Sequence, residues 1–252
     1  NDNDVVLEYI NSNDLERLAP MGTSCPDHFL RTKIQPLVLD LGTDADISDT
    51  KEILKKLKPS FEKYRQEYKD YYETCKKDNS PAMRDPNPVI IIYPGVGMFS
   101  FAKNKQTTRV ANEFYVNAIN VMRGAEAMTE YTSLPRQEAF DIEYWLLEEA
   151  KLQRMPKEKP LSRKVALVTG AGGGIGKAIA DKLAAEGANV ILTDIAEDRL
   201  KEAVATYPSD TASYAVCDVT KSESITTAYK KACLDFGGVD IIVHSAGLAI
   251  SK

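Results

Sequence analysis

The sequence is poor in cysteine and histidine, and it has no long hydrophobic run. Four cysteines and two histidines occur among 252 residues, and no two cysteines form a Cys-x-x-Cys pair. This spacing argues against a disulfide framework and against a zinc ribbon. No apolar stretch reaches the length of a membrane span, and no signal peptide opens the chain. We therefore expect a reduced, cytoplasmic setting and no membrane partner.

Positive charge is also in short supply. The net charge is -5 and the isoelectric point is near 5.3, which disfavours binding to nucleic acid or to an anionic membrane. What remains is an ordinary globular composition, with 43% hydrophobic and 27% charged residues. The length suits one large domain or two small ones. A small-molecule substrate is the expected partner.

A charged segment with two prolines near position 155 predicts a boundary between two domains. Residues 155–163 read Met-Pro-Lys-Glu-Lys-Pro-Leu-Ser-Arg, and two prolines among charged residues suit neither a helix nor a central strand. We assign them as a linker between a first domain, 1–154, and a second, 164–252. The sequence starts without methionine and stops without an evident terminus, so we expect a fragment truncated at both ends.

The second domain alternates short apolar runs with helical patterns. Short β-branched runs are typical of strands buried on both faces of a parallel sheet. The expected strands are residues 164–169, 189–194, 212–217 and 239–244, and the expected helices are residues 177–187, 196–206 and 222–236. The first helix has apolar residues at helical spacing, namely Ala178, Ile179, Leu183 and Ala184. This order predicts an α/β fold with a doubly wound parallel sheet, here a partial Rossmann fold.

Glycines fill the turn after the first of these strands, in the run Val168-Thr-Gly-Ala-Gly-Gly-Gly-Ile-Gly176. Gly170 allows a sharp turn, Gly174 allows the backbone to approach a pyrophosphate, and Gly176 allows the helix to pack closely. The start of the helix offers free N–H groups to phosphates. Asp194 ends the second strand, about 20 residues further on, where a carboxylate accepts ribose hydroxyls and repels a 2′-phosphate. The pattern predicts a site for NAD rather than NADP.

Three motifs in this order resemble the short-chain dehydrogenase/reductase family. They are Thr169-Gly170-x-x-x-Gly174-x-Gly176, Asp218-Val219 after the third strand, and Ser245-Ala246-Gly247 after the fourth. The family has asparagine where this chain has the shorter Ser245. The resemblance implies a set of cofactor-binding residues: Gly170, Gly172, Gly173, Gly174, Ile175, Gly176, Asp194, Ile195, Asp218, Val219, Ser245, Ala246 and Gly247.

The same resemblance implies that the catalytic residues lie elsewhere. The family's catalytic Ser and Tyr-x-x-x-Lys follow its Asn-Ala-Gly motif, and only five residues follow Gly247 here. Hydride transfer at a carbonyl needs a proton donor or acceptor at the oxygen. Tyr64 and Tyr68 lie near lysines, but a packed helix face is the better interpretation of both. We expect no catalytic residue in this chain and no activity from the fragment alone.

The first domain is expected to contain three helices and a strand. Residues 50–78 read as helical, with Pro59 opening a second part at its first position. An aromatic stripe, typical of a core or a subunit contact, follows: Phe61, Tyr64, Tyr68, Tyr71 and Tyr72. A strand at 88–93, a glycine loop at 94–101 and helices at 105–128 and 140–154 come next, the last with Phe140, Tyr144 and Leu147 on one side. Gly95-Val-Gly97 lacks the third glycine of a nucleotide turn.

Several segments of this domain, together with the linker, resemble bifunctional enzymes that join a class II aldolase domain to a short-chain dehydrogenase. The segments are residues 23–33, 95–101, 114–125 and 137–150. The best-known members resemble rhamnulose-1-phosphate aldolase fused to a lactaldehyde-oxidising dehydrogenase. The resemblance implies the C-terminal part of an α/β class II aldolase-like domain, aldol cleavage of a ketose 1-phosphate, NAD-dependent oxidation of the resulting hydroxyaldehyde, and a homo-oligomer in the full-length protein.

Metal ligands are too few for the aldolase chemistry. Class II aldolases typically hold zinc with three histidines, and the zinc stabilises an enediolate. His28 and His244 are the two histidines, and they lie in different domains. We expect no metal site in this chain and zinc only upstream of it. Cys25 and Asp27 beside His28 form an alternative metal corner, although a hydrogen-bonded structural histidine is the commoner outcome.

Two further alternatives stay open. Arg31 and Lys33 are candidates for contact with a substrate phosphate, although exposed basic residues are the commoner outcome. The chain is interpreted as a fragment of a bifunctional sugar-catabolic enzyme with the capacity to bind NAD, but it also fits a non-catalytic NAD-binding module or a structural module whose glycine turn holds no ligand. NAD titration separates the last of these from the others.

Overall fold

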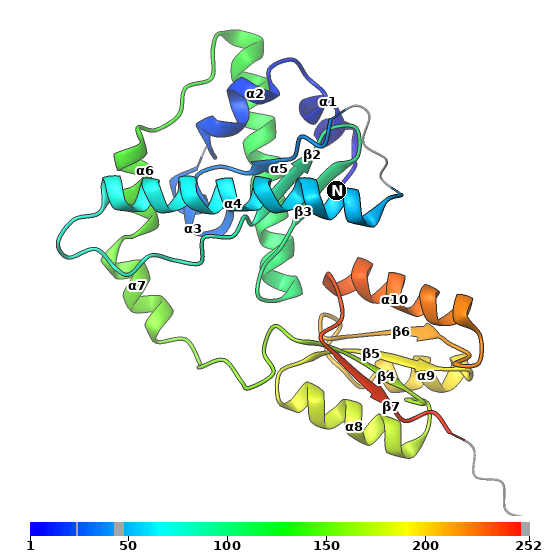
Figure 1. The fold of residues 1–252 in the computed structure, drawn as a ribbon. Coiled ribbons are helices and arrows are strands. Elements are labelled where there is room, and N and C mark those ends of the chain that lie inside the picture. Colours follow the sequence, from blue (N-terminus) through cyan, green and yellow to red (C-terminus); the bar gives the residue numbers. More distant parts are fainter. Residues whose placement is uncertain (24, 43–47, 248–252) are drawn as a thin grey trace, which may run out of the picture. The chain divides into compact units, whose positions relative to one another are not determined.

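The computed structural model describes residues 1–23, 25–42 and 48–247 (Figure 1). The chain forms two compact units, each with its own hydrophobic core. The first contains Asn1–Ala102 and Thr107–Met155, and the second contains Lys103–Gln106 and Pro156–Lys252.

The second unit is a parallel sheet with helices on both faces. Its strands lie in the order β6-β5-β4-β7, and every pairing is parallel. The elements are β4 (Val165–Thr169), α8 (Gly174–Ala185), β5 (Asn189–Asp194), α9 (Glu197–Val204), β6 (Ala212–Val216), α10 (Ser222–Phe236) and β7 (Ile241–His244). α8 and α9 pack on one face and α10 on the other (Figure 1). The predicted doubly wound parallel sheet is confirmed.

The helix α8 differs from the prediction in its start and its buried face. It begins at Gly174 rather than Lys177, and its buried residues are Gly176 and Ala180. Of the four apolar residues at helical spacing, Ala178 is exposed and the other three are half-buried. The close approach of Gly176 to the preceding turn fixes the rotation of the helix, and residues at i+4 from it then face the sheet.

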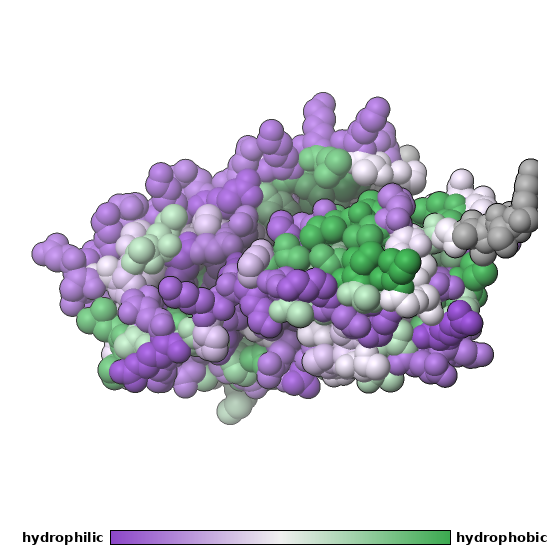
Figure 2. All heavy atoms as spheres, turned by 90° about the horizontal axis from the view of Figure 1, so that it is seen from below, coloured by the Kyte–Doolittle hydropathy of each residue, from purple (hydrophilic) through white to green (hydrophobic). Residues whose placement is uncertain are grey.

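Part of the apolar surface of the second unit stays exposed. Figure 2 shows hydrophobic side chains gathered in one region of the face drawn, with hydrophilic residues over much of the rest. The most exposed large apolar residues of this unit are Ile175, Ile195 and Leu234, at 77%, 73% and 85%. The first two lie at the carboxyl ends of the strands, where ligands of doubly wound sheets bind.

The first unit contains a three-stranded sheet in the order β1-β2-β3. Its strands are β1 (Leu37–Val38), β2 (Ile90–Tyr93) and β3 (Gly97–Ser100). β1 pairs with β2 in parallel and β3 pairs with β2 antiparallel. The predicted glycine loop at 94–101 is therefore a hairpin, because Gly95 (φ 78°) supplies the left-handed turn and Met98 is fully buried in the core.

The long helix α4 (Thr50–Cys75) runs without interruption through Pro59, so the predicted division at this proline is wrong. Proline removes the hydrogen bond to the carbonyl four residues earlier, here that of Lys55. Lys55 is exposed, and water can take the place of the missing donor. The buried side chains of α4, Tyr64, Tyr68, Tyr71, Tyr72 and Cys75, all follow Pro59. The predicted packing of the aromatic stripe is confirmed for these four tyrosines.

The predicted helix 140–154 is wrong in its extent. Two helices, α6 (Arg136–Glu143) and α7 (Leu146–Gln153), are separated by Tyr144 and Trp145. Trp145 is extended, with φ -64° and ψ 129°. Phe140 and Tyr144 are buried, but Leu147, which was predicted on the same side of one helix, is 58% exposed. It lies on α7, which has no buried residue.

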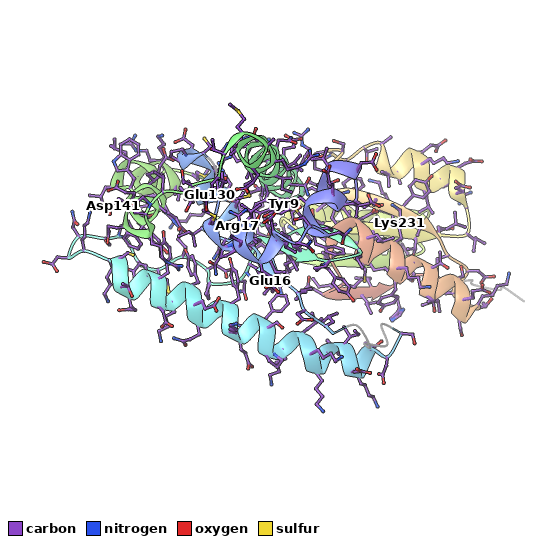
Figure 3. The ribbon with its side chains drawn as sticks, turned by 90° about the horizontal axis from the view of Figure 1, so that it is seen from above. Tyr9, Glu16, Arg17, Glu130, Asp141 and Lys231 are labelled. Carbon is purple, nitrogen blue, oxygen red and sulfur yellow. The ribbon has the colours of Figure 1, made fainter. Side chains whose placement is uncertain are left out.

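The remaining helices complete the first core. They are α1 (Asp4–Ile10), α2 (Leu15–Leu18), α3 (Phe29–Thr32), α5 (Lys105–Met128) and two 3₁₀ turns, Ala19–Met21 and Pro26–His28. The predicted helix at 105–128 is confirmed. Arg17 on α2 binds Glu126 at 2.6 Å and approaches Glu130 to 3.9 Å, which ties α2 to the end of α5 (Figure 3). Among the described residues, no helix is long and apolar enough to cross a bilayer.

Candidate functional site

A groove of about 590 Å³ lies at the carboxyl ends of the strands in the second unit. Every residue predicted to bind the cofactor lines it, except Gly172. Three residues outside that predicted set also line the groove: Arg199, Cys217 and Thr220. The parallel sheet explains this convergence, because the motifs follow β4, β5, β6 and β7, whose carboxyl ends meet at one edge.

The glycine turn is tightly packed at Gly170 and Gly176 and open at Gly174. Gly170 has φ 69°, and a Cβ there would lie 2.8 Å from the backbone of Ala246. A Cβ on Gly176 would lie 2.3 Å from the carbonyl oxygen of Gly170, so this glycine packs on the turn itself. A Cβ on Gly174 would meet nothing within 4 Å. The space over Gly174 is thus free for a ligand.

Asp194 is fixed against this turn by two backbone groups. Its Oδ2 accepts a hydrogen bond from the N–H of Gly172 at 3.1 Å, and its Oδ1 accepts one from the N–H of Ala196 at 3.0 Å. A Cβ on Gly172 would lie 2.9 Å from the carboxyl carbon. Gly172 therefore stands behind the carboxylate instead of lining the groove, and Asp194 remains able to accept further hydrogen bonds.

Asp218 organises the loop after β6. Its carboxylate accepts hydrogen bonds from the hydroxyl and the N–H of Thr220, at 2.7 Å and 3.0 Å, and it pairs with Lys221 at 3.1 Å. The Thr220 hydrogen bonds, with help from Lys221, lower the pKa of Asp218 to about 2. This carboxylate is negatively charged at any physiological pH and holds Val219 at the groove.

Thr169 is a positioning residue that the predicted set of cofactor-binding residues did not include. Its Oγ1 accepts hydrogen bonds from the N–H groups of Ser245 and Ala246, both at 3.1 Å. The Ser245-Ala246-Gly247 segment is thereby held against the end of β4. The threonine of the Thr-Gly motif is the signal in the sequence, but its partners lie 76 and 77 residues away.

The groove contains one cation among the residues that the structure describes there. Lys177 points away from it, because its ammonium binds Asp181 at 2.5 Å and lies 4.7 Å from the centre of the Tyr207 ring. Arg199, near the start of α9, lines the groove instead. The wall therefore combines two carboxylates, Asp194 and Asp218, with one guanidinium and the exposed side chains of Ile175 and Ile195.

Comparison with known families agrees with this geometry. A family model described as the second domain of class II aldolases matches residues 1–152. The chain belongs to the class II aldolase second-domain family. A model for short chain dehydrogenases matches residues 164–252. The chain therefore joins an aldolase-like domain to a short-chain dehydrogenase domain, as the motifs predicted.

Individual relatives match either the whole chain or about a third of it. The chain is 37% identical over 255 residues to YuxG, an uncharacterized oxidoreductase of Bacillus subtilis (strain 168), in a match that covers 100% of the chain and 37% of YuxG. It is 43% identical over 92 residues to the uncharacterized oxidoreductase SAR2567 of Staphylococcus aureus (strain MRSA252), covering 36% of the chain and 40% of that protein. The chain spans less than half the length of these curated relatives.

Two solved structures are similar to about a third of the chain. A hydroxysteroid dehydrogenase from Escherichia coli is 37% identical, covers 34% of this chain and 38% of its own, and has a TM-score of 0.33. A short-chain dehydrogenase/reductase described as a glucose/ribitol dehydrogenase from Brucella melitensis is 32% identical, covers 38% and 41%, and has a TM-score of 0.36.

In the aldolase-like domain, His28 is held by an aromatic contact. Its ring stacks on Phe114 with centroids 3.7 Å apart, and its Nδ1 is buried without a hydrogen-bond partner. Within residues 1–23, 25–42 and 48–247, no group of three His, Cys, Asp or Glu side chains could hold a metal ion. Cys25 and Asp27 are therefore not assembled with His28 into a metal corner in the described part of the chain.

His28 should titrate below the ordinary histidine range. Burial lowers its pKa below 6.5, and this effect outweighs the opposing influence of Asp27. Because the unfolded chain then binds more protons than the folded one just below pH 6.5, stability is complete above that pH and falls as the pH drops through the window. NMR titration of the His28 ring, assigned with His244→Gln, measures the pKa. Phe114→Leu should move it toward 6.5, and an unchanged value would contradict the role of the stack.

The candidate phosphate contact at Lys33 is not available. Its ammonium donates to the carbonyl of Asp85 and lies 3.8 Å from the centre of the Tyr68 ring, and the residue is 7% exposed. Burial lowers the pKa of Lys33 to about 8. Its backbone, at φ 62° and ψ 176°, lies in a region that is almost confined to glycine. Arg31 is exposed, as the commoner alternative predicted.

Lys33 belongs to a buried polar network around Glu143, which is 1% exposed. Glu143 Oε1 accepts a hydrogen bond from the hydroxyl of Tyr68 at 2.6 Å, and the hydroxyls of Tyr68 and Tyr144 are 2.7 Å apart. The N–H of Arg84 donates to Tyr144 at 3.2 Å. Burial raises the pKa of Glu143, although Tyr68 and Lys33 oppose that rise. The buried carboxyl group of Glu143 and the buried ammonium of Lys33 are thus stabilised by each other and by the polar groups around them.

Three tyrosines of α4, Tyr64, Tyr68 and Tyr72, use their hydroxyls for hydrogen bonds within the domain. The hydroxyl of Tyr64 donates to the carbonyl of Gln35 at 2.8 Å, and burial raises the pKa of both Tyr64 and Tyr68. A dehydrogenase acid needs the opposite shift. The spacing Tyr-x-x-x-Lys does occur at Tyr72 and Lys76, but Tyr72 donates to the carbonyl of Pro81 at 2.7 Å and Lys76 pairs with Glu73 at 2.5 Å.

Proposed function

We propose that the groove of the dehydrogenase domain binds NAD, and that the complete protein is a bifunctional sugar-catabolic enzyme. Its aldolase domain would cleave a ketose 1-phosphate of the rhamnulose-1-phosphate type, and its dehydrogenase domain would oxidise the resulting hydroxyaldehyde. The observation that carries the proposal is Asp194, fixed by two backbone N–H groups at the rim of a glycine turn that has free space over Gly174. The family membership of both halves supports it.

The residues present suit a dinucleotide. α8 starts at Gly174 without a side-chain cap, so its first N–H groups are available to a pyrophosphate. Asp194 would accept the hydroxyls of the adenosine ribose, and Val219 and Ile195 would flank the adenine. Ser245, Ala246 and Gly247, held by Thr169, would line the second ribose. NAD supplies the hydride acceptor when it is bound, and these residues orient it and exclude water from its apolar parts.

The same assignment separates nucleotide binding, by this chain, from catalysis by other parts of the complete protein. We propose that this chain binds the nucleotide but does not turn over a substrate, because no tyrosine is among the described residues that line the groove. The zinc and its ligands would come from another part of the aldolase domain. We also propose a cytoplasmic homo-oligomer that acts on small molecules and not on nucleic acid. A non-catalytic NAD-binding module is the second candidate. It would be favoured if the complete gene product bound NAD but showed no turnover.

Asp194 should set the choice between NAD and NADP. A 2′-phosphate would meet a fixed carboxylate and would remove its hydrogen bonds to the ribose, which we expect to separate the two affinities by ~2 kcal/mol, roughly thirtyfold. Asp194→Asn keeps an oxygen for the N–H of Ala196 but removes the charge, so the ratio should fall to a few-fold. Isothermal titration calorimetry with both cofactors, on this chain and on the complete gene product, measures the ratio.

Asp198→Asn is the matched control, because Asp198 lies in the first turn of α9 but does not line the groove. It should leave the ratio unchanged. Equal affinities of the unmutated protein for NAD and NADP would show that Asp194 does not face the ribose. Absence of any binding of either cofactor by the complete gene product would instead favour a structural role for the glycine turn.

A further inference from the structure

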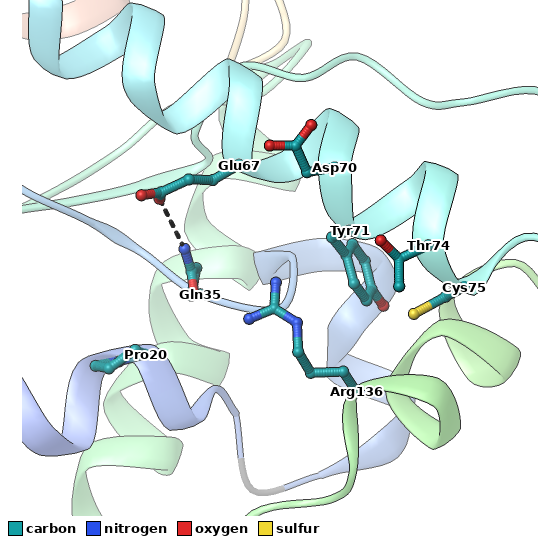
Figure 4. A pocket seen from close by; sticks show the side chains of 8 residues that line it. All are labelled: Pro20, Gln35, Glu67, Asp70, Tyr71, Thr74, Cys75 and Arg136. Carbon is teal, nitrogen blue, oxygen red and sulfur yellow. Dashed lines mark hydrogen bonds between the residues drawn. The ribbon is translucent and has the colours of Figure 1, made fainter.

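A second hollow lies in the aldolase-like domain, between α4 and the start of α6, and holds about 490 Å³. None of its lining residues belongs to the nucleotide groove. Its charged side chains are Glu67 and Asp70 from α4 and Arg136 from α6 (Figure 4). The hollow is therefore a separate, polar site with one positive and two negative groups.

Arg136 is oriented without being neutralised. Its guanidinium carbon lies 5.3 Å from the centre of the Tyr71 ring, a distance typical of a cation–π contact. Within the described part of the chain, no carboxylate lies within 4.0 Å of this guanidinium. Figure 4 shows the guanidinium directed into the hollow, with Tyr71 beside it. Its planar set of N–H donors suits a carboxylate from a ligand.

The two carboxylates are oriented by neutral amides. Glu67 Oε2 accepts a hydrogen bond from the Gln35 amide at 3.4 Å, drawn in Figure 4, and Asp70 Oδ1 accepts one from the Gln66 amide at 2.7 Å. Lys63 approaches Glu67 to 3.8 Å, but it is 79% exposed, so solvent screens this pair strongly. Both carboxylates keep lone pairs that can accept hydrogen bonds from an ammonium or a hydroxyl.

The floor of the hollow is rigid. Tyr71 is 2% exposed, its ring meets Phe140 edge-on with centroids 5.7 Å apart, and its hydroxyl is buried without a hydrogen-bond partner. A ligand would thus meet a fixed aromatic surface that already holds Arg136 in place. Preorganisation of this kind lowers the entropic cost of binding.

We propose that this hollow binds a small zwitterion of the amino-acid class, with its carboxylate on Arg136 and its ammonium between Glu67 and Asp70. The charges select this chemistry. A phosphate dianion would gain one guanidinium and face two carboxylates, and a hydroxy acid would leave both carboxylates without a counter-charge. A zwitterion complements both signs at once.

The test uses L-serine and glycerate, which have the same carbon skeleton and differ in an ammonium against a hydroxyl. Titrated into the whole chain and followed by NMR, L-serine should bind in the millimolar range, on the order of 1–10 mM. Glycerate should bind at least about fivefold more weakly, and inorganic phosphate more weakly still. Arg136→Gln should weaken L-serine at least about tenfold, and Glu67→Gln should reduce the preference for L-serine over glycerate.

Arg154→Gln is the matched control, because Arg154 is an exposed arginine at the end of α7 outside the hollow; it should change nothing. No response to L-serine up to about 50 mM would overturn the proposal. Equal binding of L-serine and glycerate, or tighter binding of phosphate, would overturn the role of the two carboxylates. Equal losses of L-serine affinity in Arg136→Gln and Arg154→Gln would show that the effect comes from general surface charge and not from this hollow.

Discussion

Replacing Gly176 with alanine should abolish measurable NAD binding and destabilise the dehydrogenase domain. The new Cβ would lie 2.3 Å from the carbonyl oxygen of Gly170, which belongs to backbone that cannot rotate away as a side chain would. The start of α8 must therefore move from the turn. We expect a loss of stability of about 1–3 kcal/mol from this overpacking and a loss of NAD affinity of at least about a hundredfold. Thermal unfolding and calorimetry of the complete gene product measure the two effects.

Gly174→Ala separates the two effects. Its Cβ would enter open space, so the domain should fold with unchanged stability. NAD affinity should still fall, because the methyl group would occupy the space assigned to the pyrophosphate. If Gly174→Ala binds NAD normally, the phosphates do not lie over this residue. If Gly176→Ala keeps both stability and binding, the tight contact with Gly170 is not required.

Removal of the Glu143 side chain should destabilise the aldolase-like domain by about 3–5 kcal/mol. Glu143→Ala would leave the buried ammonium of Lys33 without its carboxylate neighbour and the hydroxyl of Tyr68 without its acceptor. Trp145 is the chain's single tryptophan and follows Tyr144, a member of the network. Its fluorescence during urea unfolding therefore reports on this domain alone.

Two comparisons test the electrostatic cause of this loss. Glu138→Ala, an exposed change in the first turn of the same helix, should cost less than about 1 kcal/mol. Replacing both charges, in Lys33→Met with Glu143→Leu, should recover much of the loss, because buried pairs often tolerate apolar replacement. A double variant that is less stable than either single variant would show that shape, and not charge, dominates at this place.

The parallel sheet and the glycine turn could be predicted because their signals are local. Apolar runs such as 164–169 and 189–194 indicate strands whichever helices pack on them, and a glycine-rich turn does not depend on residues far away in the sequence. The break at Tyr144 had no such signal. The Tyr144 hydroxyl contacts Tyr68 and the N–H of Arg84, which lie 76 and 60 residues earlier, and only the folded chain brings these together.

The same distinction applies to the groove. Asp194 ends β5 and Asp218 follows β6, so both could be placed by counting along the chain. Thr169 could not, because its role depends on the return of residues 245 and 246 to the end of β4. Arg199 lines the groove because of the rotation of α9 about its axis. In the same way, the rotation of α8 decides that Ala180 is buried and Ala178 is exposed. Helix rotation is set by packing, which the spacing of apolar residues defines only approximately.

The uninterrupted passage of α4 through Pro59 has a consequence for motion. Every fully buried residue of the helix follows the proline, so the turns before it are attached to the domain by few contacts. The missing donor at position 59 also removes one rung of the hydrogen-bond ladder at that point. Residues 50–58 should therefore open as a separate cooperative segment, at a much lower free energy than the section from Tyr64 to Cys75. Proteases and solvent deuterium would meet this end of the helix first.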